Sequence, residues 1–138
     1  MKNKGLSFAA LLFSLIVLVA GLAGAQKKLT FYYVDHGSAS SPAFWPEYYN
    51  GIRDATEMLA PLGVEVKHLA AGELDFKTQE QMLRQAVAAN PDGIVTSMRN
   101  PKGYDAILRP LVARGVPIMA ANIDDPRPVG ERKIGKSV

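Results

Sequence analysis

The sequence predicts an α/β fold in which a parallel four-stranded sheet carries helices on both faces. Bulky β-prone runs alternate with segments of helical spacing, and glycine or proline stands at nearly every change of period. Strand and helix alternate from Leu29 onward, an order typical of parallel strands joined by right-handed crossovers. The chain has 138 residues, of which 48% are hydrophobic, and this composition suits one packed domain.

The first residues have the order of a secretory signal. Lys2 and Lys4 precede an almost wholly apolar run over residues 6–20, and small residues then end at Ala25. The apolar run falls short of the ~20 residues that a bilayer-spanning helix needs, which disfavours an uncleaved anchor. We therefore expect residues 1–25 to be a signal peptide, with the mature protein periplasmic or secreted.

The first strand and helix lie between Leu29 and Gly63. Residues 29–34 are bulky and β-prone, and Gly63 is suited to close the following helix in a left-handed conformation. The apolar positions of that helix recur at helical spacing: Tyr48, Ile52, Ala55, Leu59 and Leu62.

The remaining elements repeat the same alternation. Residues 64–69 alternate apolar and polar side chains, which predicts a strand nearer an edge of the sheet. A helix over 77–90, a buried strand over 93–97, a helix over 103–114 and a strand over 117–121 follow. Pro110 interrupts the last helix, so a kink or a helix start near Arg109 is expected.

The carboxyl ends of parallel strands share one edge of the sheet, and open α/β sheets bind ligands there. The loops expected at this edge cover residues 36–45, 70–76, 98–102 and 122 onward. Phe44 and Trp45 can supply flat apolar faces for a sugar ring. The alternative is that both rings pack the helix entrance against the sheet, and spacing alone does not separate the two roles.

Polar residues in the other loops complete a candidate carbohydrate site. Asn122 and Asp124 follow the last strand and can bond vicinal hydroxyls. Arg99 either reaches a ligand hydroxyl or is simply exposed.

Several other functions are disfavoured by composition and motif. The chain has no cysteine, which excludes disulfides, thiolate metal sites and a cysteine nucleophile. Neither the dinucleotide-binding nor the Walker glycine pattern is present. A serine of the first loop with His36 as base lacks the G-x-S-x-G context, so we expect no enzyme, and no cofactor or metal either. Two of the 16 Lys and Arg residues lie in the leader, which nearly balances the rest against 13 acidic residues and argues against nucleic-acid binding.

An ordered set of motifs resembles the periplasmic sugar-binding proteins of the ribose-binding type, the solute receptors of ABC importers. Singly each motif is weak, but together they cover nearly all of residues 29–126 in family order. The motifs are Phe31-Tyr32-Tyr33-Val34, His36-Gly37-Ser38, Pro42-Ala43-Phe44-Trp45, Gly51-Ile52-Arg53-Asp54-Ala55, Leu62-Gly63-Val64, Asn90-Pro91-Asp92-Gly93-Ile94-Val95, Gly115-Val116-Pro117-Ile118 and Asn122-Ile123-Asp124-Asp125-Pro126.

The resemblance implies a Rossmann-like lobe of the type I periplasmic binding fold, in which two lobes close over a sugar. It places Phe44 and Trp45 where the family stacks aromatic rings, and Asn122 where the family bonds hydroxyls. His36 falls in the first loop of the same site, and Arg99 is one of three residues that match a polar contact after the third strand.

The family is about twice as long as this chain. We therefore expect residues 26–126 to be the N-terminal sugar-binding lobe and residues 127–138 a solvated tail or broken hinge segment, in a truncated receptor. The implied function is that of an extracytoplasmic receptor for a sugar importer, with the membrane permease as partner in the intact family. The alternative is a non-catalytic interaction module that pairs with another copy or with a separately encoded lobe.

Overall fold

The computed structural model describes residues 27–38, 43–72 and 75–132, so the expected signal peptide and the end of the tail lie outside the described residues. The elements in chain order are β1 (Leu29–Ser38), α2 (Trp45–Leu59), the 3-10 turn η1 (Ala60–Leu62), β2 (Val64–Gly72), α3 (Phe76–Ala88), β3 (Gly93–Thr96), α4 (Pro101–Ala113), β4 (Ile118–Ala120) and the 3-10 turn η2 (Val129–Glu131).

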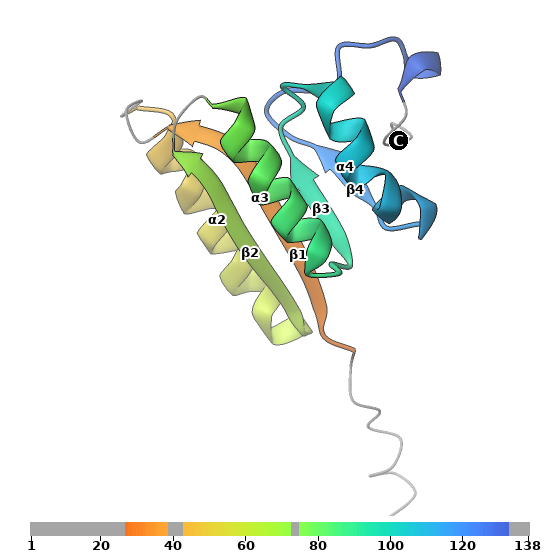
Figure 1. Ribbon diagram of the computed structural model, residues 1–138. Helices are drawn as coiled ribbons and strands as arrows, with labels where there is room; N and C mark the ends of the chain where they lie inside the picture. Colours follow the sequence, from red (N-terminus) through yellow and green to blue (C-terminus); the bar gives the residue numbers. More distant parts are fainter. Residues whose placement is uncertain (1–26, 39–42, 73–74, 133–138) are drawn as a thin grey trace, which may run out of the picture.

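The strands form one parallel sheet in the order β2-β1-β3-β4. The expected fold class is confirmed, with α2 on one face of the sheet and α3 and α4 on the other (Figure 1). The expected edge position of β2 is also confirmed for the described sheet. The chain leaves β1 toward β2 and later returns to β3 on the other side, so the strand order reverses between β1 and β3. This reversal is where an open α/β sheet leaves a crevice at its carboxyl edge.

Local sequence explains how the helices begin and end. Asp75 caps α3, because its carboxylate accepts hydrogen bonds from the backbone N–H groups of Lys77 and Thr78. Gly63 and Gly115 follow η1 and α4 with φ of 75° and 73°, left-handed values that suit glycine and that the sequence predicted.

Two element boundaries differ from the sequence expectation. Strand β1 extends to Ser38, because its pairing with β2 runs on to Asp35 and resumes between Ser38 and Gly72. His36 therefore belongs to the strand rather than to a loop. Helix α4 also continues through Pro110, so the alternative of a helix start near Arg109 is wrong. Pro110 and Ala106, whose carbonyl loses its usual donor, are both exposed, and water can satisfy that carbonyl.

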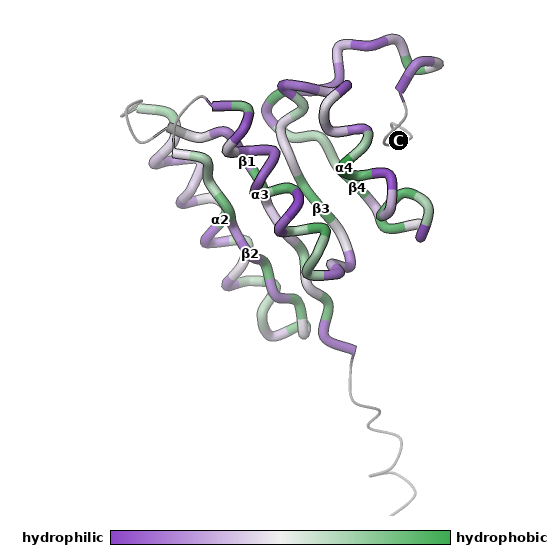
Figure 2. Tube along the Cα trace, viewed as in Figure 1, coloured by the Kyte–Doolittle hydropathy of each residue, from purple (hydrophilic) through white to green (hydrophobic). Residues whose placement is uncertain are grey.

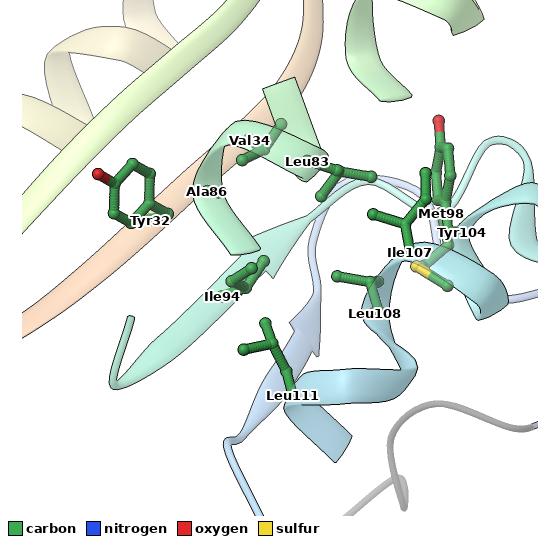
Figure 3. Packing of buried hydrophobic residues seen from close by; sticks show 10 residues of the cluster. All are labelled: Tyr32, Val34, Leu83, Ala86, Ile94, Met98, Tyr104, Ile107, Leu108 and Leu111. Carbon is green, nitrogen blue, oxygen red and sulfur yellow. The ribbon is translucent and has the colours of Figure 1, made fainter. Parts of the chain in front are cut away.

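The hydrophobic core lies between the sheet and the pair α3–α4 (Figure 3). Its aliphatic centre consists of fully or almost fully buried side chains from β1, α3, β3 and α4: Val34, Leu83, Ala86, Ile94, Leu108 and Leu111. A hydrophobic stretch runs along β3, whereas the segment after β4 is mostly hydrophilic (Figure 2). Burial of the aliphatic stripes of α3 and α4 thus fixes the carboxyl ends of β1 and β3 side by side.

The segment after β4 is fastened to α4 by an arginine between two carboxylates. Arg127 bonds Asp105 through Nη1 at 2.7 Å and Nη2 at 3.0 Å, and Nη2 also lies 2.6 Å from Asp125. The paired carboxylates raise the pKa of Arg127, and Arg127 in turn lowers the pKa of Asp125. Arg132 bonds the backbone oxygen of Arg127 and pairs with Asp124. The expectation of a solvated cationic tail is wrong for these two arginines, because acidic partners lie on α4 and in the same segment.

Candidate functional site

The candidate site lies at the carboxyl ends of β1 and β3, at the reversal of strand order. His36 near the end of β1 is buried, and its Nδ1 lies 2.6 Å from the hydroxyl of Ser97, which directly follows β3. Burial and the nearby positive charge of Arg99 lower the pKa of His36, so the neutral imidazole is favoured. A neutral imidazole offers one donor and one acceptor.

A buried amide organises the polar groups around Ser97. Gln79 of α3 donates from Nε2 to the backbone oxygen and the hydroxyl of Ser97, both at 3.0 Å, and approaches Thr96 Oγ1 at 3.3 Å. Its Oε1 accepts a 2.7 Å hydrogen bond from Tyr104 of α4. Burial raises the pKa of Tyr104 to about 12, so its hydroxyl keeps the proton that it donates. This network ties β3, α3 and α4 together beneath the site.

Arg99 extends from the segment that joins β3 to α4. Its guanidinium lies over the ring of Phe76, 4.4 Å from the ring centroid, at the first turn of α3. Its Nη1 is buried and has no hydrogen-bond partner, and the described ranges provide no ion pair for this side chain. Arg99 is therefore a positioned donor beside His36.

Aromatic side chains gather where α2 begins. The ring of Trp45 lies 5.1 Å from that of His36 in an edge-to-face arrangement, and it also contacts Tyr48 and Tyr49. Trp45 is only 6% exposed, which fits the alternative that it packs the helix entrance against the sheet. Phe44 is 49% exposed and stacks on Tyr48. Of the two rings, Phe44 has the more open face, and a stacking role for either one stays a prediction.

Asp35 and His68 form a second polar pair on the α2 side of the sheet. The buried Asp35 carboxylate lies 2.6 Å from His68 Nε2 and accepts a 2.6 Å hydrogen bond from the Gly37 N–H. It also accepts from Tyr49 at 3.4 Å, and burial together with the Asp35 charge raises the pKa of Tyr49 to about 12. A Cβ at Gly37 would collide with Tyr49 and Asp35, so this close approach requires glycine.

Asn122 and Asp124 lie at the same end of the sheet but farther along it. Asn122 follows β4, is exposed and has a left-handed φ of 66°, which asparagine tolerates better than most residues. Since β3 separates β1 from β4, Asn122 is roughly 10 Å from His36 by strand spacing. Asp124 is exposed, accepts from the Asp125 N–H at 2.8 Å and pairs with Arg132. The structure thus brings His36, Trp45 and Arg99 together and leaves Asn122 and Asp124 toward the β4 side.

The geometry offers little support for a catalytic triad or a metal centre. Asp35 was considered as the orienting acid for His36, but its carboxylate faces His68. Within the described part of the chain, no group of three acidic or histidine side chains is placed to hold a metal ion.

Sequence reasoning missed the amide network and the tyrosines. Gln79 stands four residues before Leu83, on the apolar stripe of its helix, and a polar residue on such a stripe is a signal for a buried hydrogen-bond network. Thr96 and Ser97 end a buried apolar strand, which is a similar signal. Tyr48 and Tyr49 were counted as helix residues only, although they follow the two flagged aromatics at helical spacing.

Comparison with solved structures places this architecture among binding-protein lobes. The chain is similar to an ABC sugar transporter periplasmic sugar-binding protein from Legionella pneumophila, with 25% identity and a TM-score of 0.60 over 71% of this chain and 34% of that chain. It is also similar to AraP, an arabinose-binding protein from Geobacillus stearothermophilus, with 26% identity and a TM-score of 0.54 over 70% of this chain and 31% of the other. A LacI-type transcriptional regulator from Bacteroides fragilis, at 19% identity and a TM-score of 0.60 over 75% of this chain and 36% of the regulator, shares the fold.

The chain spans about a third of the length of each of these structures. No protein-family model matches the sequence, and no curated protein matches it either. The fold is that of an α/β lobe of the type I periplasmic binding proteins, as the sequence motifs implied. None of the helices in the described ranges is long and apolar enough to cross a bilayer.

Proposed function

We propose that this lobe binds a monosaccharide-like ligand at the carboxyl edge of its sheet, as part of an extracytoplasmic receptor for an ABC-type sugar importer. The observation that carries the proposal is the meeting of hydrogen-bonding groups and aromatic rings between β1 and β3. His36, Arg99 and Trp45 lie together there, in a fold shared with a sugar-binding protein from Legionella pneumophila. Open α/β sheets bind ligands at this reversal of strand order.

The described groups match the surface of a sugar. The half-open ring of Phe44 offers an apolar face for C–H groups, while His36 and Arg99 offer donors to hydroxyl oxygens. Asn122, toward β4, can bond a second edge of the same ring. A single lobe supplies only part of the contacts of a closed two-lobe site, so we expect a dissociation constant on the order of 1 mM for this chain.

Titration of the labelled chain with arabinose, glucose and galactose, followed by ¹⁵N–¹H NMR, tests the proposal. We expect amide shifts concentrated at the ends of β1 and β3 and at the start of α2. The variant Phe44→Ala should weaken binding several-fold through lost stacking. Met58→Ala on the same helix should not, because Met58 is 76% exposed and lies near the other end of α2. Shifts scattered over the surface, or equal effects of the two variants, would refute a site at this edge.

A second candidate function is pairing of this lobe with another copy or with a separate lobe, without any catalysis. It is favoured by β4, which bonds only β3 within the described sheet and carries Met119 at 64% exposure. Light scattering coupled to size exclusion measures the mass in solution. A dimer that Met119→Glu dissociates supports pairing, and a monomer at all concentrations rules out self-association.

A further inference from the structure

Arg99 presents a buried cationic donor that nothing in the described chain neutralises. Its Nη1 is inaccessible to solvent and lacks an acceptor, although the guanidinium is fixed over Phe76. Of the carboxylates around it, Glu80 accepts from the Asn100 side chain at 3.0 Å, and Asp35 is held by His68. Buried charges in proteins are normally paired, so this one points to an anionic group that arrives from outside.

The hydrogen-bond network also fixes which nitrogen of His36 carries the proton. Gln79 must direct Nε2 toward Ser97, because the backbone oxygen of Ser97 can only accept. Within the described residues, the Ser97 hydroxyl contacts Gln79 Nε2, which is a donor, and His36 Nδ1. The buried hydroxyl proton therefore has Nδ1 as its acceptor. Burial and the Arg99 charge lower the pKa of His36, so the ring is neutral and its Nε2 carries the hydrogen.

Both groups at this point of the edge are consequently donors. His36 offers Nε2–H, and Arg99 offers the N–H groups of a planar fork that matches the two oxygens of a carboxylate. Helix α4 begins directly after this segment without an acidic residue in its first turn, so its positive dipole end is not offset there. A neutral sugar presents hydroxyls, which need both an acceptor and a donor, whereas a carboxylate only accepts.

We propose that the ligand of this lobe is a sugar acid, and that its carboxylate binds between Arg99 and the Nε2–H of His36. This inference rests on the proposed sugar-binding function and names the substrate class of the same site. The carboxylate supplies the counter-charge that Arg99 lacks, while the sugar ring extends toward Phe44 and Asn122.

The test compares three ligands that share one ring. Galacturonate, its neutral methyl ester and galactose are titrated into the labelled chain at pH 7 and constant ionic strength, with affinities read by ¹⁵N–¹H NMR. We expect galacturonate to bind at least ~10-fold more tightly than either neutral sugar, which corresponds to about 1.4 kcal/mol. Arg99→Gln should reduce galacturonate to the level of galactose. Arg99→Lys should recover only part of the preference, because an ammonium lacks the fork.

Two further variants guard against a simple charge effect or an internal partner. Lys102→Gln removes one cation from the exposed first turn of α4 and should change the galacturonate affinity less than ~2-fold, since screened surface charges contribute little. Glu73, three residues before Phe76, lies outside the described residues. Unchanged affinity in Glu73→Gln is expected, and a gain would overturn the inference by identifying Glu73 as the partner of Arg99.

The remaining outcomes separate this inference from the proposed function. Equal binding of galacturonate and galactose overturns the sugar-acid preference and leaves sugar binding intact. No binding of any of the three overturns both. Long-range ¹H–¹⁵N spectra of the histidine rings give an independent reading, because a proton on Nδ1 of His36 would contradict the donor assignment.

Discussion

The two faces of the sheet are built from different kinds of side chains. On the α3–α4 face, Leu83, Leu108 and Leu111 are completely buried, and Gln79 is the fully buried polar side chain of α3. On the other face, Trp45 is the buried residue of α2, and Tyr33 and Tyr48 are only partly buried. The first face is an aliphatic core, while the second is an aromatic and hydroxyl-rich layer open to solvent. The difference teaches that stability and ligand recognition draw on separate sides of the same strands.

The largest expected effect comes from the aliphatic face. Leu108→Ala should lower the free energy of unfolding by about 3 kcal/mol, since it removes a buried side chain and leaves a cavity. Met58→Ala, on the exposed surface of α2, should cost less than about 0.5 kcal/mol. Urea denaturation followed by circular dichroism measures both. Similar losses in the two variants would contradict the division between the faces.

The same tyrosine substitution on each face gives a closer comparison. Tyr104→Phe removes the donor to Gln79 Oε1 inside the core and should cost about 2 kcal/mol, because a buried acceptor is left unpaired. Tyr33→Phe breaks the hydroxyl contact with Tyr48, where water can replace the lost partner, and should cost below about 1 kcal/mol. Urea midpoints, analysed with a common slope, decide the order. A larger loss for Tyr33→Phe would mean that the α2 face is as well sealed as the core.

The ion-paired segment after β4 should contribute less than the core. Arg127→Gln leaves Asp105 and Asp125 facing each other without a cation and should cost about 1–2 kcal/mol. Lys28→Gln breaks an exposed pair with Glu65 and should cost about 0.3 kcal/mol or less. Thermal unfolding at low and high salt distinguishes them, and an Arg127→Gln variant as stable as the parent would show that the clasp is not stabilising.

The smallest effect is a pH dependence at the site. The pKa of His36 is lower in the folded protein than the ~6.5 of an unfolded chain, so the unfolded state takes up the proton first. The contribution of His36 is therefore complete above pH ~6.5 and is lost as the pH falls below it. The lowered pKa values of Asp75, Asp92 and Asp125 act in a separate window, at more acidic pH.

His36→Gln should flatten the decline of stability between about pH 7 and 5, where one proton accounts for a slope of at most ~1.4 kcal/mol per pH unit. His68→Gln, which leaves His36 and Ser97 in place, is the matched control and should retain that decline. Denaturant titrations at several pH values provide the measurement. An unchanged slope in His36→Gln would assign the pH dependence elsewhere.

Periodicity and punctuation were enough to predict the fold. Alternating periods predicted the elements, and the glycines at 63 and 115 marked the helix ends because only a left-handed residue fits there. The ends of β1 were not predictable, since the pairing of Asp35 and Ser38 with β2 is a long-range interaction. Pro110 misled because its cost depends on whether its turn faces solvent, which local sequence does not state.

The candidate site was predictable in location but not in detail. Parallel strands bring their carboxyl ends together whatever their side chains, so the edge itself followed from topology. Which residues meet there depends on the register between β1 and β3 and on the angle of each helix. Ser97 and Gln79 therefore came to light only in three dimensions, as did the burial of Trp45.

The position of Gln79 has a practical consequence for protein engineering. One amide group spans a helix, a strand end and a tyrosine of the next helix, so its loss would shift the backbone from which Arg99 projects. A biosensor derived from this lobe should thus vary Phe44, Asn122 and Arg99 to alter selectivity and keep the glutamine constant. Libraries that randomise position 79 would return mostly misfolded clones rather than new specificities.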